Sequence, residues 1–413
     1  MWGEQIKRFF PSIVTNIDFL KLWLAQITSQ IGLNALYFIL ALKVYEQTQG
    51  SNTAVSLLIL AFTVPSVFFG YLAGVLVDHQ DLKKVLIYTN LFRALVVFGL
   101  LFVYTNIFFI YGLVLLLALV TLFFLPAEGS ALPALVKEKK DLISANSLFT
   151  LTLQGALIIG FVAAGPLLSL LGETTTLIVL VAFFLIALAC VWFLPDSIRS
   201  IEEKEGVSSW RSFLDGIIFF FKTRSVRDAI FFLTSTQAIT LVLATIAPGF
   251  VDRVLDLDVR LTSLVLVAPA AVGMIVGSVF LSHRAGKHKE AVLVTWGLFV
   301  AGISFSALSV LERVKLSNFI FLLAILFIVL LGVAASLITI PATTELQHDT
   351  PERFRGRAYG ILGTFVSGVS ALPVILAGAI GDTFGVRSVM IAMAIVTIAA
   401  GVYRLRGKSY TEG

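Results

Sequence analysis

The feature that most limits what this chain can fold into is its series of apolar runs, each about 20 residues or longer, a length typical of membrane-spanning helices. The runs lack the apolar/polar alternation of membrane-barrel strands. In hydrocarbon the backbone must satisfy its own hydrogen bonds, so such runs predict helices. Charged residues make up 13% of the chain and hydrophobic residues 58%, which leaves too little polar surface to cover a globule in water. We therefore expect an all-α membrane protein.

Reading the runs between charges, Gly/Pro clusters and turn residues predicts twelve spans. Their limits are 18–45, 52–77, 84–104, 107–136, 141–171, 174–194, 226–251, 261–283, 289–311, 317–345, 354–381 and 386–405. The longest polar stretch begins at Pro195 and separates six spans from six. We predict an N-terminal six-helix bundle at 1–194, a cytoplasmic linker at 195–225 and a C-terminal six-helix bundle at 226–413.

The Lys and Arg residues are distributed unevenly between the two sets of span ends. With the N-terminus placed in the cytoplasm, all but seven of the 30 lie at cytoplasmic ends. Arg93 lies within a span, and six lie at outer ends: Lys43, Arg253, Arg260, Arg313, Lys315 and Arg387. This asymmetry predicts that both termini are cytoplasmic. Scattered basic residues also argue against the continuous basic stripe of a nucleic-acid-binding protein. The N-terminal segment lacks the compact apolar core of a signal peptide, so we expect the first span to remain.

The two halves of the chain resemble one another. The second span contains GYLAG from Gly70, and the eighth contains GMIVG from Gly273. The fourth span ends with LPAEGSAL from Leu125, and the tenth ends with IPATTEL from Ile340. Matches at corresponding positions predict two related six-helix bundles with a cavity between them.

The end of the second span carries a spaced set of small and charged residues. Gly70 and Gly74 are one helical turn apart, so they leave a face that another helix can approach closely. Asp78 follows near the C-terminal end of the helix, where the helix dipole repels a carboxylate. Lys83 or Lys84 would supply a positive partner, although a solvated turn with incidental charges is the alternative.

Gly74, Asp78 and the two lysines resemble the signature that follows the second helix of the major facilitator superfamily. His79 stands where an Arg is usual, and Asp81 and Leu82 depart from the usual Gly and Arg. The resemblance implies the twelve-helix fold in two pseudo-symmetric bundles. It also implies a charged gate on the cytoplasmic side, for which Arg355 and Arg357 are the other candidate partners of the acid.

A second stretch, FFLPAEGSALPALVKEKKDLISANSL from Phe123, is similar to the drug:proton antiporter branch that includes macrolide and siderophore (enterobactin) exporters. It is also similar to lysophospholipid transporters. The matching positions are Pro126, Ala127, Leu132, Pro133, Leu135, Val136, Ala145, Asn146 and Leu148. PERFRGRAYG, from Pro351, is similar to the matching turn in the second half.

The fifth span contains GALIIGFVAAGP, which is similar to the Gly/Pro motif of exporters in the superfamily. Leu167, Leu168 and Ser169 replace the small residues expected after it. Pro166 removes one helical hydrogen bond and permits a kink, and Gly160 and Gly165 allow tight packing. Gly70, Gly160, Gly165 and Pro166 are therefore predicted packing residues, and a link between this motif and transport direction stays open.

Few ionisable residues fall inside the spans, and such residues are costly enough to suggest function. Glu128, between Pro126 and Gly129, is the best candidate for proton coupling. Glu345 is the second candidate, and Arg93 is the third ionisable residue of this group. A structural role in packing or gating is the alternative for each.

Amide side chains mark one face of the first span. Gln26, Gln30 and Asn34 recur every four residues, and Gln237 is their nearest counterpart in the second half. If helices 1, 4, 7 and 10 line the cavity, as the resemblance implies, these amides and Glu128 would border it among many apolar residues. Such a cavity suits an amphipathic substrate. Hydrogen bonds between helices are the alternative role.

The leading hypothesis is a secondary transporter that exports a drug-like or siderophore-like compound by proton antiport, as a monomer in the plasma membrane, the bacterial inner membrane. The alternative is a lysophospholipid transporter of the same superfamily. Membrane enzymes are disfavoured because the histidines form no metal-ligand pair with an acid at helical spacing. They are His79, His283, His288 and His348. We expect no cofactor and no metal, and the single cysteine, Cys190, excludes an intrachain disulfide.

Overall fold

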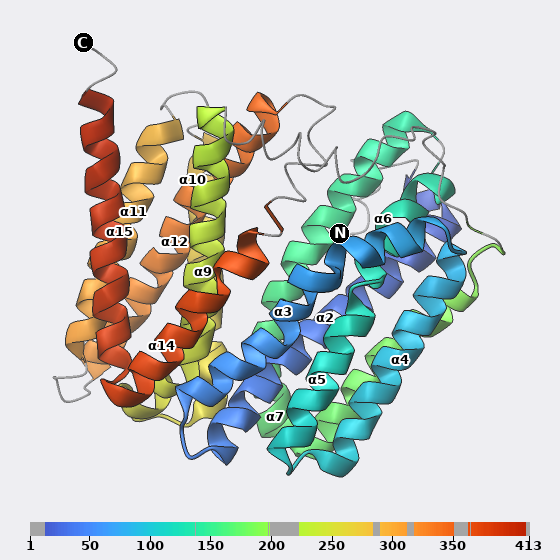
Figure 1. The fold of residues 1–413 in the computed structure, drawn as a ribbon, viewed down its shortest axis with the longest axis horizontal. Helices are drawn as coiled ribbons and strands as arrows, with labels where there is room; N and C mark the ends of the chain where they lie inside the picture. The colour runs from blue at the N-terminus through green and yellow to red at the C-terminus, as the bar shows by residue number, and fades with distance from the viewer. Residues whose placement is uncertain are drawn as a thin grey trace. The chain divides into compact units, whose positions relative to one another are not determined.

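The computed structural model describes residues 13–136, 138–196, 198, 223–283, 290–311, 318–350, 362–363 and 365–409, and these are almost entirely helical (Figure 1). In this part of the chain, eleven helices are long and apolar enough to cross a membrane. One of them covers Asp141–Trp192, which is 52 residues, and Gly172 within it has φ 73 and ψ 173. This break divides the helix into two crossings, so the architecture is the predicted all-α membrane fold with room for twelve spans. The predicted linker at 195–225 lies mostly outside the described residues.

The helices follow the predicted spans closely. In the first half they are α2 (Ile17–Gln47), α3 (Asn52–Asp78), α4 (Leu82–Val103), α5 (Ile107–Thr121), α6 (Phe124–Leu135) and α7 (Lys139–Trp192). In the second half they are α9 (Arg224–Arg253), α10 (Ala268–His283), α11 (Glu290–Leu311), α12 (Asn318–Asp349), α14 (Ala371–Thr383) and α15 (Val386–Ser409). Short helical turns lie at Ile13–Thr15 (η1), Val259–Leu261 (η2) and Ser263–Val267 (η3, one π turn).

Proline and glycine explain where helices bend. The predicted span at 107–136 matches one apolar span at Ile107–Leu135, which consists of two helices, α5 and α6. Pro126 has no N–H to donate to the carbonyl of Leu122, and the helix is interrupted at that turn. The π turn of η3 likewise precedes Pro269. Gly172 adopts a left-handed φ that a residue with a side chain rarely adopts, so α7 turns there.

The chain forms two compact units. Unit 1 comprises Met1–Lys43 and Ala61–Lys204, and unit 2 comprises Val44–Leu60 and Glu205–Gly413. The turn between α2 and α3, with the ends of both helices, therefore belongs to unit 2 although it lies early in the sequence. The predicted division into bundles at 1–194 and 226–413 remains a prediction.

Unit 1 has an apolar core built by α2, α4, α6 and α7. Phe19 and Leu22 of α2 pack with Leu86 of α4, Phe124 of α6 and Phe149 of α7. The indole N–H of the half-buried Trp23 donates to Thr152 Oγ1 at 2.7 Å, which joins α2 to α7. Large hydrophobic side chains on the outside of the unit are exposed, as expected for surface that faces lipid: Phe108 is 82% exposed and Leu170 81%.

Unit 2 is held together by close helix packing. Helices α10 and α11 pack against α12, and α11 also packs against α15. A Cβ placed on Gly273 of α10 would collide with the carbonyl of Val329, and one on Gly332 of α12 would collide with the carbonyl of Ala270. The two backbones can therefore touch only because both positions are glycine.

Candidate functional site: a buried polar cluster in unit 1

Three ionisable or amide side chains meet inside unit 1, each on a different helix. Gln26 lies on α2, Arg93 on α4 and Glu128 on α6. Gln26 and Arg93 are 0% exposed and Glu128 is 2% exposed, so all three are cut off from solvent. The Gln26 amide donates to Glu128 Oε2 at 3.4 Å and to the carbonyl of Phe149 at 3.5 Å.

The guanidinium of Arg93 is held from two directions. Its Nε donates to Thr121 Oγ1 of α5 at 3.2 Å. Its Cζ lies 4.1 Å from the ring centroid of Phe124, a cation–π distance. Arg93 also interacts electrostatically with Glu128 and with Tyr37 of α2. Tyr37 stacks on Phe62 with ring centroids 4.3 Å apart, which fixes the orientation of its phenol.

Several polar atoms of this cluster have no hydrogen-bond partner among the residues that the structure describes. Both terminal nitrogens of Arg93, Oε1 of Glu128 and Oε1 of Gln26 are buried and unpartnered. Native proteins rarely leave buried polar atoms unsatisfied, so such a cluster is a candidate functional site. The cluster therefore combines a fixed cation with a carboxyl group that has one free oxygen.

The cluster includes partners that sequence reasoning missed. Tyr37, Thr121 and Phe124 were not singled out, and neither was the carbonyl of Phe149. A helical signal existed for Tyr37, because it follows Asn34 by three residues on the face that bears the other amides. Thr121 and Phe124 carried a similar signal, because they precede Glu128 by seven and four residues and helical spacing places them on its face.

The other predicted amides are placed as follows. Gln30 is buried, and Asn34 donates its amide to the carbonyl of Gln30 at 2.8 Å. Gln237 is exposed on α9 in unit 2. A cavity that these amides share remains a prediction.

The second predicted acid, Glu345, is half-buried on α12 in unit 2. It interacts electrostatically with Arg404 of α15, as does Asp228 of α9. The Arg404 guanidinium lies 4.3 Å from the ring centroid of Phe232. Glu345 therefore has a cationic neighbour that the sequence did not indicate, and its role in proton coupling remains a prediction.

The predicted gate is only partly described. Gly74 and Asp78 lie on the last turns of α3, but the side chain of Asp78 lies outside the described part, as do Arg355 and Arg357. Lys84 is exposed. Lys83 donates to the Leu194 carbonyl and to Asp196 Oδ1, both at 2.7 Å. The Lys83 ammonium thereby holds the pKa of the Asp196 carboxyl below its usual value.

The predicted packing residues differ in their surroundings. A Cβ on Gly160 of α7 would lie 2.8 Å from Asn34 Cβ and 2.8 Å from the carbonyl oxygen of Ile31, so α7 and α2 touch closely there. Among the described residues, no heavy atom lies within 4 Å of a Cβ placed on Gly70 or Gly74. Gly165 is buried, and Pro166 lies inside α7.

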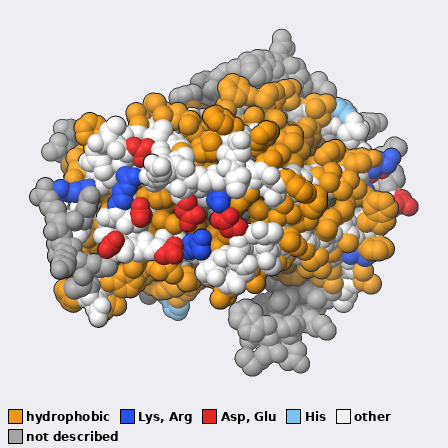
Figure 2. Space-filling model, turned by 90° about the horizontal axis from the view of Figure 1, so that it is seen from below, with side chains coloured by type: hydrophobic (Ala, Val, Ile, Leu, Met, Phe, Trp, Pro, Cys, Tyr) orange, Lys and Arg blue, Asp and Glu red, His pale blue; other side chains and the backbone are white. Residues whose placement is uncertain are grey.

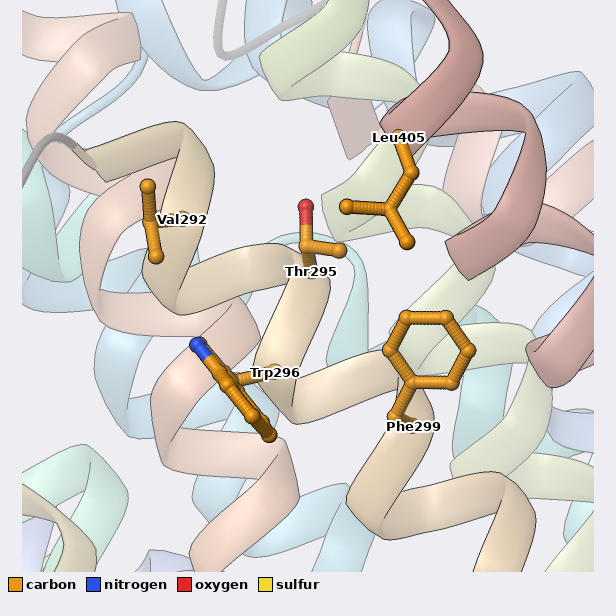
Figure 3. Close-up of a pocket in the computed structure, with 5 residues that line it drawn as sticks. All are labelled: Val292, Thr295, Trp296, Phe299 and Leu405. Atoms are coloured by element: carbon orange, nitrogen blue, oxygen red, sulfur yellow. The ribbon is translucent and has the colours of Figure 1, made fainter.

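A shallow apolar pocket lies elsewhere, in unit 2 between α11 and α15. Figure 3 shows Val292, Thr295, Trp296 and Phe299 of α11 with Leu405 of α15 around it. Its volume is about 180 Å³. Ligand pockets for drug-sized molecules span about 300–1,000 Å³. This pocket has no ionisable lining residue and contains none of the predicted site residues, so the buried cluster of unit 1 stays the candidate site.

Comparison with known proteins decides the family. The sequence profile of the Major Facilitator Superfamily matches residues 22–372. The chain belongs to the major facilitator superfamily. It is therefore a membrane transporter and not an enzyme, as predicted. Among the described residues, no group of three or more His, Cys, Asp or Glu side chains could hold a metal ion.

Relatives within the superfamily include efflux proteins. The chain is 22% identical over 394 residues to macrolide efflux protein A of Streptococcus pyogenes, covering 90% of this chain and 91% of that protein. It is 25% identical over 372 residues to the putative bacilysin exporter BacE of Bacillus subtilis (strain 168), covering 86% of each. The predicted resemblance to the drug-efflux branch is thereby confirmed.

Solved structures show the same fold at low sequence identity. The nucleoside transporter NupG matches with a TM-score of 0.76 at 13% identity, covering 95% of this chain and 99% of that one. A bacterial homologue of the lysosomal transporter Spinster, solved in an inward-facing and unoccupied conformation, matches with a TM-score of 0.71 at 13% identity. It covers 94% of this chain and 95% of that one. These matches confirm the fold class.

Proposed function

We propose that this transporter exports an amphipathic or hydrophobic small molecule, drug-like or siderophore-like, by proton antiport with alternating access. The observation that carries the proposal is the carboxyl group of Glu128, buried in unit 1 with one oxygen unpartnered and with Arg93 nearby. The family and the two efflux relatives support export, and the names of these relatives suggest macrolides and bacilysin as the first compounds to test.

Glu128 is the proposed proton carrier. Bringing an ionised carboxyl into an apolar interior is costly unless a counter-charge is present. Arg93 supplies a fixed positive charge, held in place by Thr121 and Phe124. The carboxyl can therefore lose its proton when water reaches it and remain in the cluster, while Gln26 retains its hydrogen bond to Oε2. A proton bound from one side and released to the other gives the transport cycle its driving force.

The substrate cavity is proposed to lie between the two bundles at 1–194 and 226–413, bordered by Gln26, Gln30, Asn34, Glu128 and Gln237. The cycle is proposed to open it to each side in turn. Asp78, Lys83, Lys84, Arg355 and Arg357 would control its cytoplasmic side, with Gly74 leaving space for the moving helix. Glu345 would be the second protonatable group. Both termini are proposed to lie in the cytoplasm of a bacterial cell, and the transporter is proposed to act as a monomer.

The direct test is transport of radiolabelled erythromycin into inverted membrane vesicles, where export appears as uptake. We expect uptake to rise when the vesicle interior is made acidic and to collapse when a protonophore is added. Glu128→Gln should abolish the proton-driven uptake, because an amide cannot exchange a proton, while erythromycin still raises the thermal unfolding midpoint of the purified variant.

The matched control is Glu173→Gln, which removes a half-buried acid of unit 1 that pairs with Lys43 and lies outside the proposed machinery. It should keep the wild-type, proton-driven uptake. If Glu128→Gln transports erythromycin at the wild-type rate under the same gradient, Glu128 has no part in coupling. If the wild-type protein instead moves fluorescent lysophosphatidylcholine between leaflets without any proton gradient, the drug-export proposal gives way to lysophospholipid transport.

A further inference from the structure

The first turn of α3 is held by a carboxylate from the far end of the sequence. Oδ2 of Asp382, near the end of α14, accepts from Ser51 Oγ at 2.8 Å and from the backbone N–H of Thr53 at 2.9 Å. Oδ1 accepts from the backbone N–H of Asn52 at 2.7 Å and from its side-chain amide at 3.0 Å. Four donors of one helix start therefore converge on one carboxylate.

These hydrogen bonds satisfy backbone N–H groups at the start of α3. The first N–H groups of a helix have no partner within the helix. Ser51 Oγ satisfies only the N–H of Ala54, at 3.1 Å. Asp382 accepts from the two preceding backbone N–H groups, those of Asn52 and Thr53. Its negative charge lies at the positive end of the helix dipole. A capping carboxylate is normally supplied by the residue just before the helix, but here it comes from 330 residues away.

Two more contacts attach the turn between α2 and α3 to α9. The Tyr45 hydroxyl donates to Asp252 Oδ2 at 2.8 Å. Arg253 Nη2 donates to the carbonyl of Gly50 at 2.6 Å. Gly50 has φ 92, and a Cβ there would lie 2.8 Å from Arg253 Nη2, so the turn depends on glycine at this position.

Glycines on α14 and α9 bring the segment into direct backbone contact. A Cβ on Gly378 would lie 2.7 Å from Ser56 Oγ and 2.9 Å from Thr53 Cα. A Cβ on Gly249 of α9 would lie 2.6 Å from Asn52 Oδ1. Residues 44–60 thus fit unit 2 through shape as well as through hydrogen bonds. Figure 2 views the molecule from below, towards the end at which α9 and α14 finish, and acidic and basic side chains gather there among polar ones.

We propose that Asp382 and the start of α3 form a latch, in which residues 44–60 bind to α9 and α14 in one conformation of the transporter and separate from them in another. Chain order joins these residues to α2 and α3, most of which belongs to unit 1. The latch rests on the proposed alternating access and on the proposed orientation, which places this end outside the cell. Its opening exposes the outer side of the substrate path.

The contacts suit a reversible attachment. They are hydrogen bonds at the aqueous end of the helices, and those of Asp382 with Ser51 Oγ and Thr53 N are exposed. Water can replace each of them when the segment leaves, so no polar group is stranded in an apolar interior. Gly249 and Gly378 leave a helix surface without side chains, to which residues 44–60 can bind again.

A disulfide tests whether the attachment must open. A Cβ on Gly381 would lie 3.5 Å from Asn52 Cβ, within the range of about 3.5–4.5 Å found in disulfides. Asn52→Cys with Gly381→Cys, in a Cys190→Ala background, should transport erythromycin when reduced. Oxidation should lower the rate at least ten-fold, and dithiothreitol should restore it. Each single cysteine variant should be insensitive to oxidation.

Normal transport by the fully crosslinked protein would overturn the latch, because the segment would never need to leave. Failure of the pair to crosslink under oxidation would also contradict it.

A second measurement does not need a substrate, so it separates the latch from the proposed function. Ser56→Cys, buried at 0% exposure, should react slowly with a membrane-impermeant maleimide. Adding Asp382→Ala should raise the labelling rate several-fold. Asp258→Ala should not, because that carboxylate caps η2 by accepting from Arg260 N. Equal labelling rates with and without the Asp382 carboxylate would refute the latch. This conclusion holds whether or not the protein transports erythromycin, because the labelling rate is measured without a substrate.

Discussion

Arg93 is a fully buried cation, and its neighbours determine whether unit 1 tolerates it. The guanidinium has one hydrogen bond to Thr121 and an aromatic face at Phe124, while its terminal nitrogens have no hydrogen-bond partner in the described part of the chain. Glu128 supplies a nearby negative charge. The cation and the acid therefore depend on each other energetically, although they lie on different helices.

This dependence predicts a non-additive pair of substitutions. Arg93→Ala should lower the free energy of unfolding by about 3–5 kcal/mol, because it leaves the Glu128 carboxyl without its counter-charge and opens a cavity. Glu128→Gln added to Arg93→Ala should recover part of that loss. Thermal unfolding of the four proteins in detergent measures the coupling, which we expect to be roughly 1–3 kcal/mol. Strictly additive effects would show that the two groups do not interact.

At the scale of elements, glycine has different consequences in different helices. In α10 and α12 it is required, because the two backbones are in contact at Gly273 and Gly332. In α5 a Cβ on Gly112 would meet no heavy atom within 4 Å among the described residues. The sequence pattern alone does not separate these cases, because both are glycines within apolar helices.

Gly332→Ala and Gly112→Ala are therefore a matched pair. The Gly332 substitution should destabilise unit 2 by about 1–3 kcal/mol, because α10 and α12 must move apart. The Gly112 substitution should be neutral or stabilise α5 by up to about 1 kcal/mol, because alanine favours helix more than glycine does. Unfolding midpoints in detergent compare the two. Equal effects would mean that the α10–α12 contact is not limiting.

The Lys83–Asp196 ion pair attaches the segment after α7 to the start of α4, and its contribution should depend on pH. Lys83 lowers the pKa of Asp196 in the folded protein. Its stabilisation is therefore present above the pKa of the unfolded chain, about 4, and is lost as the pH falls through the lower folded value. The effect should be small because the Asp196 side chain is 98% exposed.

Asp196→Asn should thus lower the unfolding midpoint slightly at neutral pH. The difference from the wild-type protein should shrink as the pH falls below about 4 and disappear once the pH is below the folded pKa of Asp196. Scans of the two proteins across pH, at low salt, test this. A difference that persists in acid would assign the effect of the substitution to something other than the ion pair.

At the scale of the whole molecule, the distribution of Lys and Arg predicts which ends of the helices face the cytoplasm. Gln80 lies in the turn between α3 and α4, predicted inside, and Thr105 lies in the turn between α4 and α5, predicted outside. Both are exposed. They therefore report the orientation of a single helix, α4, from its two ends.

In a Cys190→Ala background, a membrane-impermeant maleimide applied to intact cells should label Thr105→Cys and leave Gln80→Cys unmodified. Inverted vesicles should show the reverse pattern. Labelling of Gln80→Cys from outside would overturn the orientation and, with it, the placement of the latch.

The sequence by itself determined the helices of this protein and where nearly all of them begin and end. A membrane interior forces the backbone to bond within each segment, so apolar length alone defines a span. It also singled out Glu128, Arg93 and Gln26, because polar groups are costly in such segments. These inferences depend on local composition, which a sequence contains in full.

Only the tertiary structure decided which polar groups meet. Thr121 and Phe124 reach Arg93 because α5 and α6 pack against α4, and Asp382 reaches the start of α3 across 330 residues. Each contact depends on which helices are neighbours in space and on how closely glycine lets them approach. Spacing along one helix does not determine either property, and for that reason the buried cluster was predicted only in part and the attachment of residues 44–60 was not predicted.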